Sequence, residues 1–207
     1  CVDTSFFNPN NINSELSLKK RQVLGLKNDD LVLGYVGSIG TWYLLSEMLD
    51  FFKVLKTYRK EAKFLFITQE SHVNILLPAH EKGLNKEDLF IISGKRQEMP
   101  ELISLMDFGI FFIKPFYSKM ASSPTKQGEM MAMGKAVICN EGIGDTDMII
   151  NQFNAGIVVK NYDYKSAIEV LLKSKFDSSS IRQGAKDYFS LEDGIKKYQS
   201  VYEKLVS

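Results

Sequence analysis

The chain is poor in the residues that define several classes of protein. Its 207 residues include only 2 cysteines, so a disulfide framework is excluded and a reducing compartment is favoured. No apolar run reaches the roughly 18 residues that a membrane-spanning helix needs. The 26 basic and 25 acidic side chains nearly cancel, so no bulk field favours nucleic acid or an acidic surface. What remains is a globular chain long enough to bury one ample core.

The first residue is Cys1, and we find neither an initiator methionine nor a signal peptide. Two interpretations are open. Cys1 is the lipidated first residue of a lipoprotein, or the sequence is part of a longer chain. We favour the second, because the opening residues read as the end of another segment.

Short apolar segments alternate with segments of helical periodicity. The expected strands are 31–37, 62–68, 89–93, 108–113, 136–139 and 155–159. The expected helices are 42–59, 71–82, 100–106, 125–133, 145–152, 164–173, 178–189 and 191–206, with Pro78 as a possible break in the second. Because the strands are continuously apolar, this alternation predicts an α/β fold, a Rossmann-like parallel sheet with helices on both faces. Ligands of such sheets bind beyond the carboxyl ends of the strands.

The stretch 122–138 carries the strongest functional pattern. Its small and hydroxylated residues before Lys126 open a helix, whose first N–H groups and dipole attract anions. Lys126 adds a full positive charge. Glu129 follows on the same helix face, where a carboxylate can accept hydrogen bonds from two ribose hydroxyls. The pattern predicts a site for a diphosphate and a ribose. The alternative is an ordinary capped helix with a Lys–Glu surface pair.

The glycine-rich loop 37–41 follows the first expected strand and leads into a helix. Glycines there let a ligand approach the backbone, and a helix N-terminus attracts phosphate. The alternative is a tight strand-to-helix turn. The spacing of Gly34, Gly37 and Gly40 does not match the dinucleotide pattern Gly-x-Gly-x-x-Gly, which disfavours NAD, although Glu70 is placed like the ribose-binding acid of that family.

Other polar and aromatic residues have weaker patterns. Lys95 and Arg96 follow the third expected strand, where they suit either a base or phosphate contact or a solvated turn. His72 and His80 have no cysteine or acidic cluster near them in the sequence, so no metal site is expected. Trp42 and Tyr43 begin the first helix and are expected to pack in the core, with stacking on a base as the alternative.

Three segments resemble the C-terminal, donor-binding half of retaining GT-B glycosyltransferases of family four, the glycosyl transferases group one. The opening Cys-Val-Asp-Thr-Ser-Phe-Phe-Asn-Pro resembles the run that follows the family's interdomain linker. Residues 102–113, with Asp107, resemble a short helix and the strand after it. Residues 123–138, Ser-Pro-Thr-Lys-x-Gly-Glu-x-x-Ala-x-Gly-Lys-x-Val-Ile, resemble a variant nucleotide-sugar signature. The ending 190–205 resembles the closing helix, so the likeness spans nearly the whole chain.

The resemblance implies roles by position. Glu129 matches the second glutamate of the family's pair, which binds the donor ribose, and 123–126 match the loop that meets the diphosphate. The residues after the first strand match the first loop of this domain, and those after the third strand match the loop that flanks the base. The predicted donor-binding residues are Gly37, Ser38, Gly40, Thr41, Lys95, Arg96, Ser123, Pro124, Thr125, Lys126, Gln127 and Glu129.

The chain also departs from the family pattern. The first glutamate of the pair falls at Ala121, so the residues that read the transferred sugar, and the catalytic residues, are not identified. Many members carry Arg and Lys after the first strand, where this chain has Ser38 and Thr41. Lys126 and Arg96 must then supply the positive charge.

The implied function is that of the donor-binding domain of a metal-independent hexosyltransferase. It uses a UDP- or GDP-sugar in bacterial polysaccharide or glycolipid synthesis and holds no permanent cofactor. We expect a single domain over 1–207, with a lead-in at 1–30, the sheet core at 31–160 and C-terminal helices at 161–207. The N-terminal acceptor domain is expected to be missing and this fragment to be inactive alone. The full-length protein is expected in the cytoplasm, at the inner face of the membrane.

Two other functions stay open. One is a nucleotide-sugar epimerase or inverting transferase of the GT-B type, and the other is a non-catalytic nucleotide-binding module of the same fold. No nucleic-acid partner and no membrane segment within these residues are expected.

Overall fold

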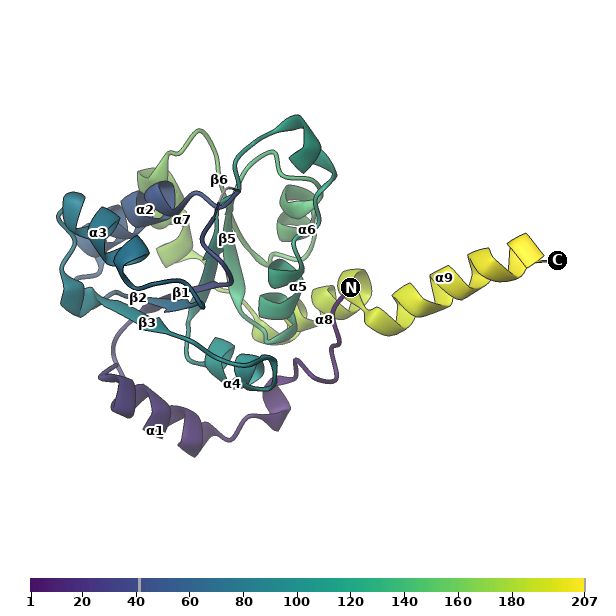
Figure 1. Cartoon of the computed structure of the whole chain (residues 1–207), viewed down its shortest axis with the longest axis horizontal. Helices are drawn as coiled ribbons and strands as arrows, with labels where there is room; N and C mark the ends of the chain where they lie inside the picture. The colour runs from purple at the N-terminus through teal and green to yellow at the C-terminus, as the bar shows by residue number, and fades with distance from the viewer. Residues whose placement is uncertain (41, 207) are drawn as a thin grey trace.

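A computed structural model describes residues 1–40 and 42–206 (Figure 1). The described residues form one parallel sheet of six strands, in the order β3-β2-β1-β4-β5-β6. The strands are β1 (Val32–Val36), β2 (Lys63–Ile67), β3 (Leu89–Ile92), β4 (Phe108–Phe111), β5 (Ala136–Asn140) and β6 (Gly156–Val159). All six predicted strands are confirmed, with bounds within two residues of those expected. The strand order reverses between β1 and β4, which makes their carboxyl ends the expected position for a ligand.

Helices cover both faces of the sheet, as predicted. Figure 1 shows α2, α3 and α7 on one face and α4, α5 and α8 on the other. The α-helices are α1 (Ser14–Leu24), α2 (Leu45–Tyr58), α3 (Val73–Glu81), α4 (Met99–Ser104), α5 (Thr125–Ala132), α6 (Thr146–Gln152), α7 (Tyr164–Lys173), α8 (Ser178–Phe189) and α9 (Leu191–Val206). Short 3-10 helices are η1 (Pro9–Asn11), η2 (Lys86–Asp88), η3 (Arg96–Glu98) and η4 (Tyr117–Ala121). Pro78 lies inside α3 without ending it.

The sequence pattern did not predict α1. This helix buries none of its residues, so it has no apolar periodicity to detect. It is defined by its ends: the Asn13 side chain accepts hydrogen bonds from the first turn, and Gly25 closes the helix in the left-handed conformation. The Arg21 guanidinium donates to the Leu105 carbonyl oxygen at 2.8 Å and fixes α1 to the body.

The first helix after β1 begins three residues later than predicted, at Leu45. Residues 42–44 instead run beside the end of β4: the Lys114 N–H donates to the Trp42 carbonyl at 2.8 Å, and Tyr43 forms an isolated antiparallel bridge with Ile113. As a result Trp42 is 42% exposed, and the prediction that it packs in the core is wrong.

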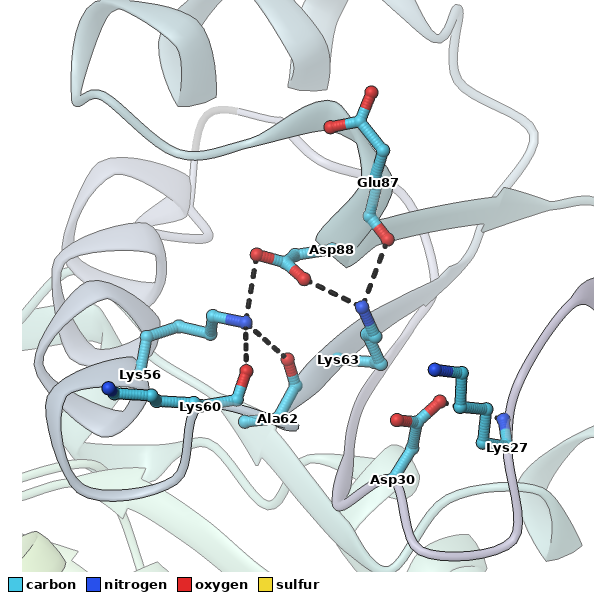
Figure 2. A network of polar contacts seen from close by, with 8 residues as sticks. All are labelled: Lys27, Asp30, Lys56, Lys60, Ala62, Lys63, Glu87 and Asp88. Atoms are coloured by element: carbon cyan, nitrogen blue, oxygen red, sulfur yellow. Dashed lines mark hydrogen bonds and ion pairs between the residues drawn. The ribbon is translucent and has the colours of Figure 1, made fainter.

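A polar network closes the amino-terminal edge of β2 and β3 (Figure 2). Asp88 is buried and accepts from Lys56 at 2.9 Å and from Lys63 at 2.7 Å. Burial raises the pKa of the Asp88 carboxyl, but the hydrogen bonds from Lys56 and Lys63 outweigh it and leave the pKa below its usual value. The same lysines donate to the carbonyl oxygens of Lys60, Ala62 and Glu87. The network stabilises the edge of the sheet opposite the carboxyl ends of the strands.

The last helix, α9, projects away from the body of the molecule (Figure 1). Apolar side chains recur at helical spacing along it, and those of Leu191, Ile195, Tyr198, Tyr202 and Leu205 are exposed. An amphipathic helix usually buries such a stripe, and here no described residue covers it. No helix within residues 1–40 and 42–206 combines the length and the apolar character needed to cross a bilayer.

Candidate functional site

Lys126 is buried at the carboxyl end of β1, in the first turn of α5. Its Nζ lies 3.1 Å from the Tyr35 hydroxyl oxygen and 3.5 Å from the centroid of the Tyr43 ring. Only 9% of the residue is exposed, and it forms no ion pair within the part of the chain that the structure describes. Burial lowers the pKa of the Lys126 ammonium group to about 7, and the charge of Glu129 opposes this shift. Such a cation is costly to bury without a counter-ion, which marks it as a candidate anion ligand.

The backbone around Lys126 is open to an anion. Helix α5 has Pro124 as its N-cap, with no capping hydrogen bond from a side chain and no acidic residue in the first turn. Its first N–H groups therefore present their partial positive charge without a side-chain carboxylate beside them. Gly37 has a φ of 114°, and a Cβ there would lie 3.1 Å from the Lys126 Nζ. Gly37 thus leaves the space into which the ammonium group extends.

Glu129 lies on the next turn of α5 and pairs with Arg96 from the segment after β3. The Arg96 guanidinium donates to the Glu129 carboxylate and lies 4.7 Å from the centroid of the Phe7 ring. The side chain of Glu129 is 12% exposed and that of Arg96 is 59% exposed, so the pair sits at the surface end of the site. The Lys–Glu surface pair considered from the sequence is not what forms, because Lys126 turns inward and Arg96 takes Glu129.

The other predicted donor-binding residues are placed less uniformly. Ser38, Gly40, Ser123 and Thr125 are exposed near the carboxyl ends of β1 and β4. Gln127 is fully buried, and its amide nitrogen is 3.5 Å from the Thr146 carbonyl oxygen while its own oxygen has no partner. Pro124 is also buried. Lys95 is exposed at the start of η3, where its N–H donates to Glu98. Thr41 lies outside the described residues.

A mostly apolar hollow of about 200 Å³ lies where β1 and β2 end. Its lining brings the predicted Gly37 and Ser38 together with residues that the sequence pattern did not assign to the site. The lining residues are Val36, Gly37, Ser38, Ile67, Thr68, Gln69, Gly94 and Met99. Thr68 and Gln69 directly follow an apolar strand, and this position is the sequence feature that could have identified them as site residues. A flat aromatic ligand fits such a lining.

Two contacts from β5 and the loop after it position the end of β4 and the segment before α5. The Asn140 side chain donates to the Ile113 carbonyl at 2.9 Å and accepts from the Ile113 N–H at 2.8 Å. Gly144 has a φ of 50°, and a Cβ there would lie 1.7 Å from the Ser122 carbonyl oxygen. Asn140 therefore fixes the end of β4, and Gly144 allows close packing against the segment before α5.

Asp145 lies at the start of the helix after β5, at the end of the loop that follows this strand. The structure places it at the N-cap of α6 but gives it no capping hydrogen bond. Instead the Tyr188 hydroxyl donates to the Asp145 carboxylate at 2.7 Å, which ties α6 to α8. Across the described residues, no group of histidine, cysteine, aspartate and glutamate side chains is arranged to hold a metal ion.

A family model described as glycosyl transferases group 1 matches residues 17–187. The match covers most of the chain, so the chain belongs to this family. It forms a C-terminal domain of the GT-B type, with the Rossmann-like sheet described above. A comparison with curated protein sequences finds no match.

Solved glycosyltransferase structures share the fold at low sequence identity. A glycosyltransferase from Rickettsia africae is 18% identical with a TM-score of 0.75, over 100% of this chain and 56% of that one. Sucrose-phosphate synthase from Thermosynechococcus elongatus is 15% identical with a TM-score of 0.73, over 99% and 51%. Anabaena HepE, solved in complex with UDP and glucose, is 15% identical with a TM-score of 0.68, over 100% and 55%. The chain thus spans about half the length of these proteins.

Proposed function

We propose that the chain is the nucleotide-sugar donor-binding domain of a retaining glycosyltransferase. The observation that carries the proposal is the buried ammonium group of Lys126, which has no described counter-ion and lies at the uncapped N-terminus of α5. A diphosphate supplies the negative charge that this position lacks. The retaining stereochemistry rests on the family resemblance alone.

The proposed chemistry is departure of a nucleoside diphosphate as the new glycosidic bond forms. The bond between the anomeric carbon and the phosphate oxygen breaks, and both electrons stay on the diphosphate. Lys126 and the first N–H groups of α5 stabilise the charge that grows on the leaving group. Because protein groups supply this stabilisation, we propose that no metal ion is required.

The rest of the donor is assigned to the neighbouring residues. Glu129 accepts hydrogen bonds from the ribose hydroxyls, and Arg96 holds its carboxylate in place. The hollow beside Gly37, Thr68 and Met99 takes the base. We propose UDP or GDP as the nucleotide; the complex of the similar Anabaena protein with UDP and glucose supports a nucleotide of this class.

The complete protein is proposed to carry a second, acceptor-binding domain. Two observations support this: the similar structures are about twice as long, and α9 exposes an apolar stripe that a neighbouring domain can cover. We propose that α9 docks on that domain and that transfer occurs in the cleft between the two. The proposed setting is polysaccharide or glycolipid synthesis in a bacterial cytoplasm, at the inner face of the membrane.

Calorimetric titration with UDP, GDP, ADP and NAD tests the proposal. UDP or GDP should bind. Denaturant unfolding with the nucleotide at one hundred times its dissociation constant should then show a free energy of unfolding higher by about 2.7 kcal/mol. Lys126→Ala should weaken diphosphates far more than the matching nucleosides. Absence of binding by every nucleoside diphosphate would contradict a donor site. Binding by the intact full-length protein without sugar transfer would favour the non-catalytic module, and interconversion of sugar epimers would favour the epimerase.

A further inference from the structure

A second hollow, of about 280 Å³, opens beside the first residues of α5. Tyr43 connects it to the proposed diphosphate position, because the Tyr43 ring covers the Lys126 Nζ at 3.5 Å and also lines the hollow. A sugar linked to a diphosphate at Lys126 therefore reaches this space. The lining residues are Trp42, Tyr43, Ile113, Lys119, Ser122, Ser123, Pro124 and Thr125.

The charge in this hollow has one sign. Among the described residues, Lys119 is the only charged residue in the lining, and it forms no ion pair. Its Nζ lies 4.3 Å from the centroid of the Trp42 ring. The Trp42 ring meets Phe116 edge-on, with centroids 5.7 Å apart, and the Lys114 Nζ lies 4.9 Å from the Phe116 ring. The ammonium groups of Lys119 and Lys114 thus lie on either side of the Trp42 and Phe116 rings, and neither ammonium group pairs with a described carboxylate.

A neutral sugar is poorly matched to this lining. Its hydroxyl donors ordinarily meet carboxylate oxygens, and the position where the resemblance expects a glutamate holds Ala121. Lys119 has three N–H donors and no acceptor, so a ligand that carries an acceptor with negative charge complements it. Trp42 is 42% exposed, so its ring offers an apolar surface to the sugar.

We propose that this hollow takes a transferred sugar that bears a carboxylate, an inference that rests on the proposed donor site. The donor is then a nucleoside diphosphate linked to a hexuronate or a similar sugar acid. The carboxylate pairs with Lys119, and the ring packs on Trp42. Lys119 is thereby a residue that determines donor specificity.

Two donors that differ only at carbon 6 test the proposal by calorimetric titration of the intact chain. UDP-glucuronate carries a carboxylate where UDP-glucose carries a hydroxymethyl group; GDP-mannuronate and GDP-mannose form the equivalent pair if GDP proves the tighter nucleotide. The wild-type chain should bind the uronate donor roughly five- to tenfold more tightly, as expected for a charged hydrogen bond at a half-exposed site. Lys119→Gln should bring this ratio close to one and leave the affinity for UDP alone unchanged.

Lys114→Gln is the matched control, because it removes the same charge one aromatic ring away from the hollow. It should keep the uronate preference. Equal affinities for both donors in the wild-type chain, or a preference that survives Lys119→Gln, would overturn the proposal. An equal loss of the uronate preference in both variants would indicate a diffuse positive field and would also overturn the contact between Lys119 and the carboxylate. Binding of UDP or GDP without uronate preference rejects this inference alone, whereas no binding of either nucleotide rejects the donor site itself.

Discussion

The Lys126 Nζ lies 3.1 Å from the Tyr35 hydroxyl oxygen, and this hydroxyl in turn donates to the Ser38 carbonyl oxygen at 2.6 Å. The chain of contacts joins the first turn of α5 to the loop after β1 across the point where the strand order reverses. A buried cation is thus held at the position where parallel sheets bind ligands. Its only described hydrogen-bond acceptor is a neutral hydroxyl, which leaves the charge available to an anion.

Lys126→Met should raise the free energy of unfolding at pH 6, because it replaces a buried ammonium group with an apolar side chain of similar length. The pKa of Lys126 is about 7 in the folded chain and higher when the chain is unfolded, so the unfolded state binds more protons between these values. The wild-type chain therefore gains stability as the pH rises above 7, by up to about 1.4 kcal/mol per pH unit. Denaturant titrations at pH 6, 7.5 and 9 should show the advantage of the variant shrinking. A constant difference would contradict a depressed pKa.

Glu129→Gln should reduce discrimination between a ribose and a deoxyribose. The wild-type chain is expected to bind UDP or GDP roughly tenfold more tightly than the 2′-deoxy form, because the deoxy form lacks the hydroxyl that donates to the carboxylate, and an amide oxygen accepts a weaker hydrogen bond from that hydroxyl. Titration of both nucleotides against wild type and variant gives the two ratios. Glu98→Gln is a suitable control, since Glu98 is an exposed carboxylate on η3 that accepts from Lys95. An unchanged ratio in Glu129→Gln would show that this carboxylate does not meet the ribose.

Asp88→Asn should lower the free energy of unfolding by about 2–4 kcal/mol and leave nucleotide affinity unchanged. The variant leaves Lys56 and Lys63 without their shared carboxylate at the edge of the sheet away from the site (Figure 2). The pKa of Asp88 is lowered in the folded chain, so its contribution is present above pH 4 and is lost as the pH falls through the folded pKa. The difference between wild type and variant should therefore narrow toward pH 3. Denaturant unfolding at pH 7 and pH 3 measures it, and a nucleotide affinity that falls with stability would argue that the two ends of the sheet are coupled.

Much of the fold could be predicted because it depends on local patterns. Continuous apolar runs separated by amphipathic segments define a covered parallel sheet, and both Lys126 and Glu129 follow from their place after such a strand. Helix α1 escaped prediction because it is held by caps and by Arg21 rather than by a buried face. The exposure of Trp42 depends on hydrogen bonds between two loops far apart in sequence, which no local pattern records.

The pairing within the site was also beyond the sequence pattern. Helical spacing placed Lys126 and Glu129 on one face, yet Lys126 turns toward Tyr35 of β1 while Glu129 meets Arg96. Tyr35 and Arg96 come from different strands or loops, so which of them each side chain meets depends on the order of the strands in the sheet. The burial of Lys126, from which its depressed pKa follows, therefore required the structure.

Proton uptake on nucleotide binding reports whether the diphosphate meets the Lys126 ammonium group. Burial lowers the pKa of Lys126 to about 7, so we expect most Lys126 side chains in the free chain to be deprotonated at pH 8. A bound diphosphate favours the charged form, so each binding event should take up close to one proton. Calorimetric titration of UDP or GDP in buffers of different ionisation enthalpy measures this number. The wild-type chain should take up nearly one proton at pH 8 and Lys126→Ala none, and the wild-type affinity should fall between pH 7 and pH 9. Binding without proton uptake in the wild-type chain would contradict the depressed pKa, and an unchanged affinity in Lys126→Ala would contradict the contact between Lys126 and the diphosphate.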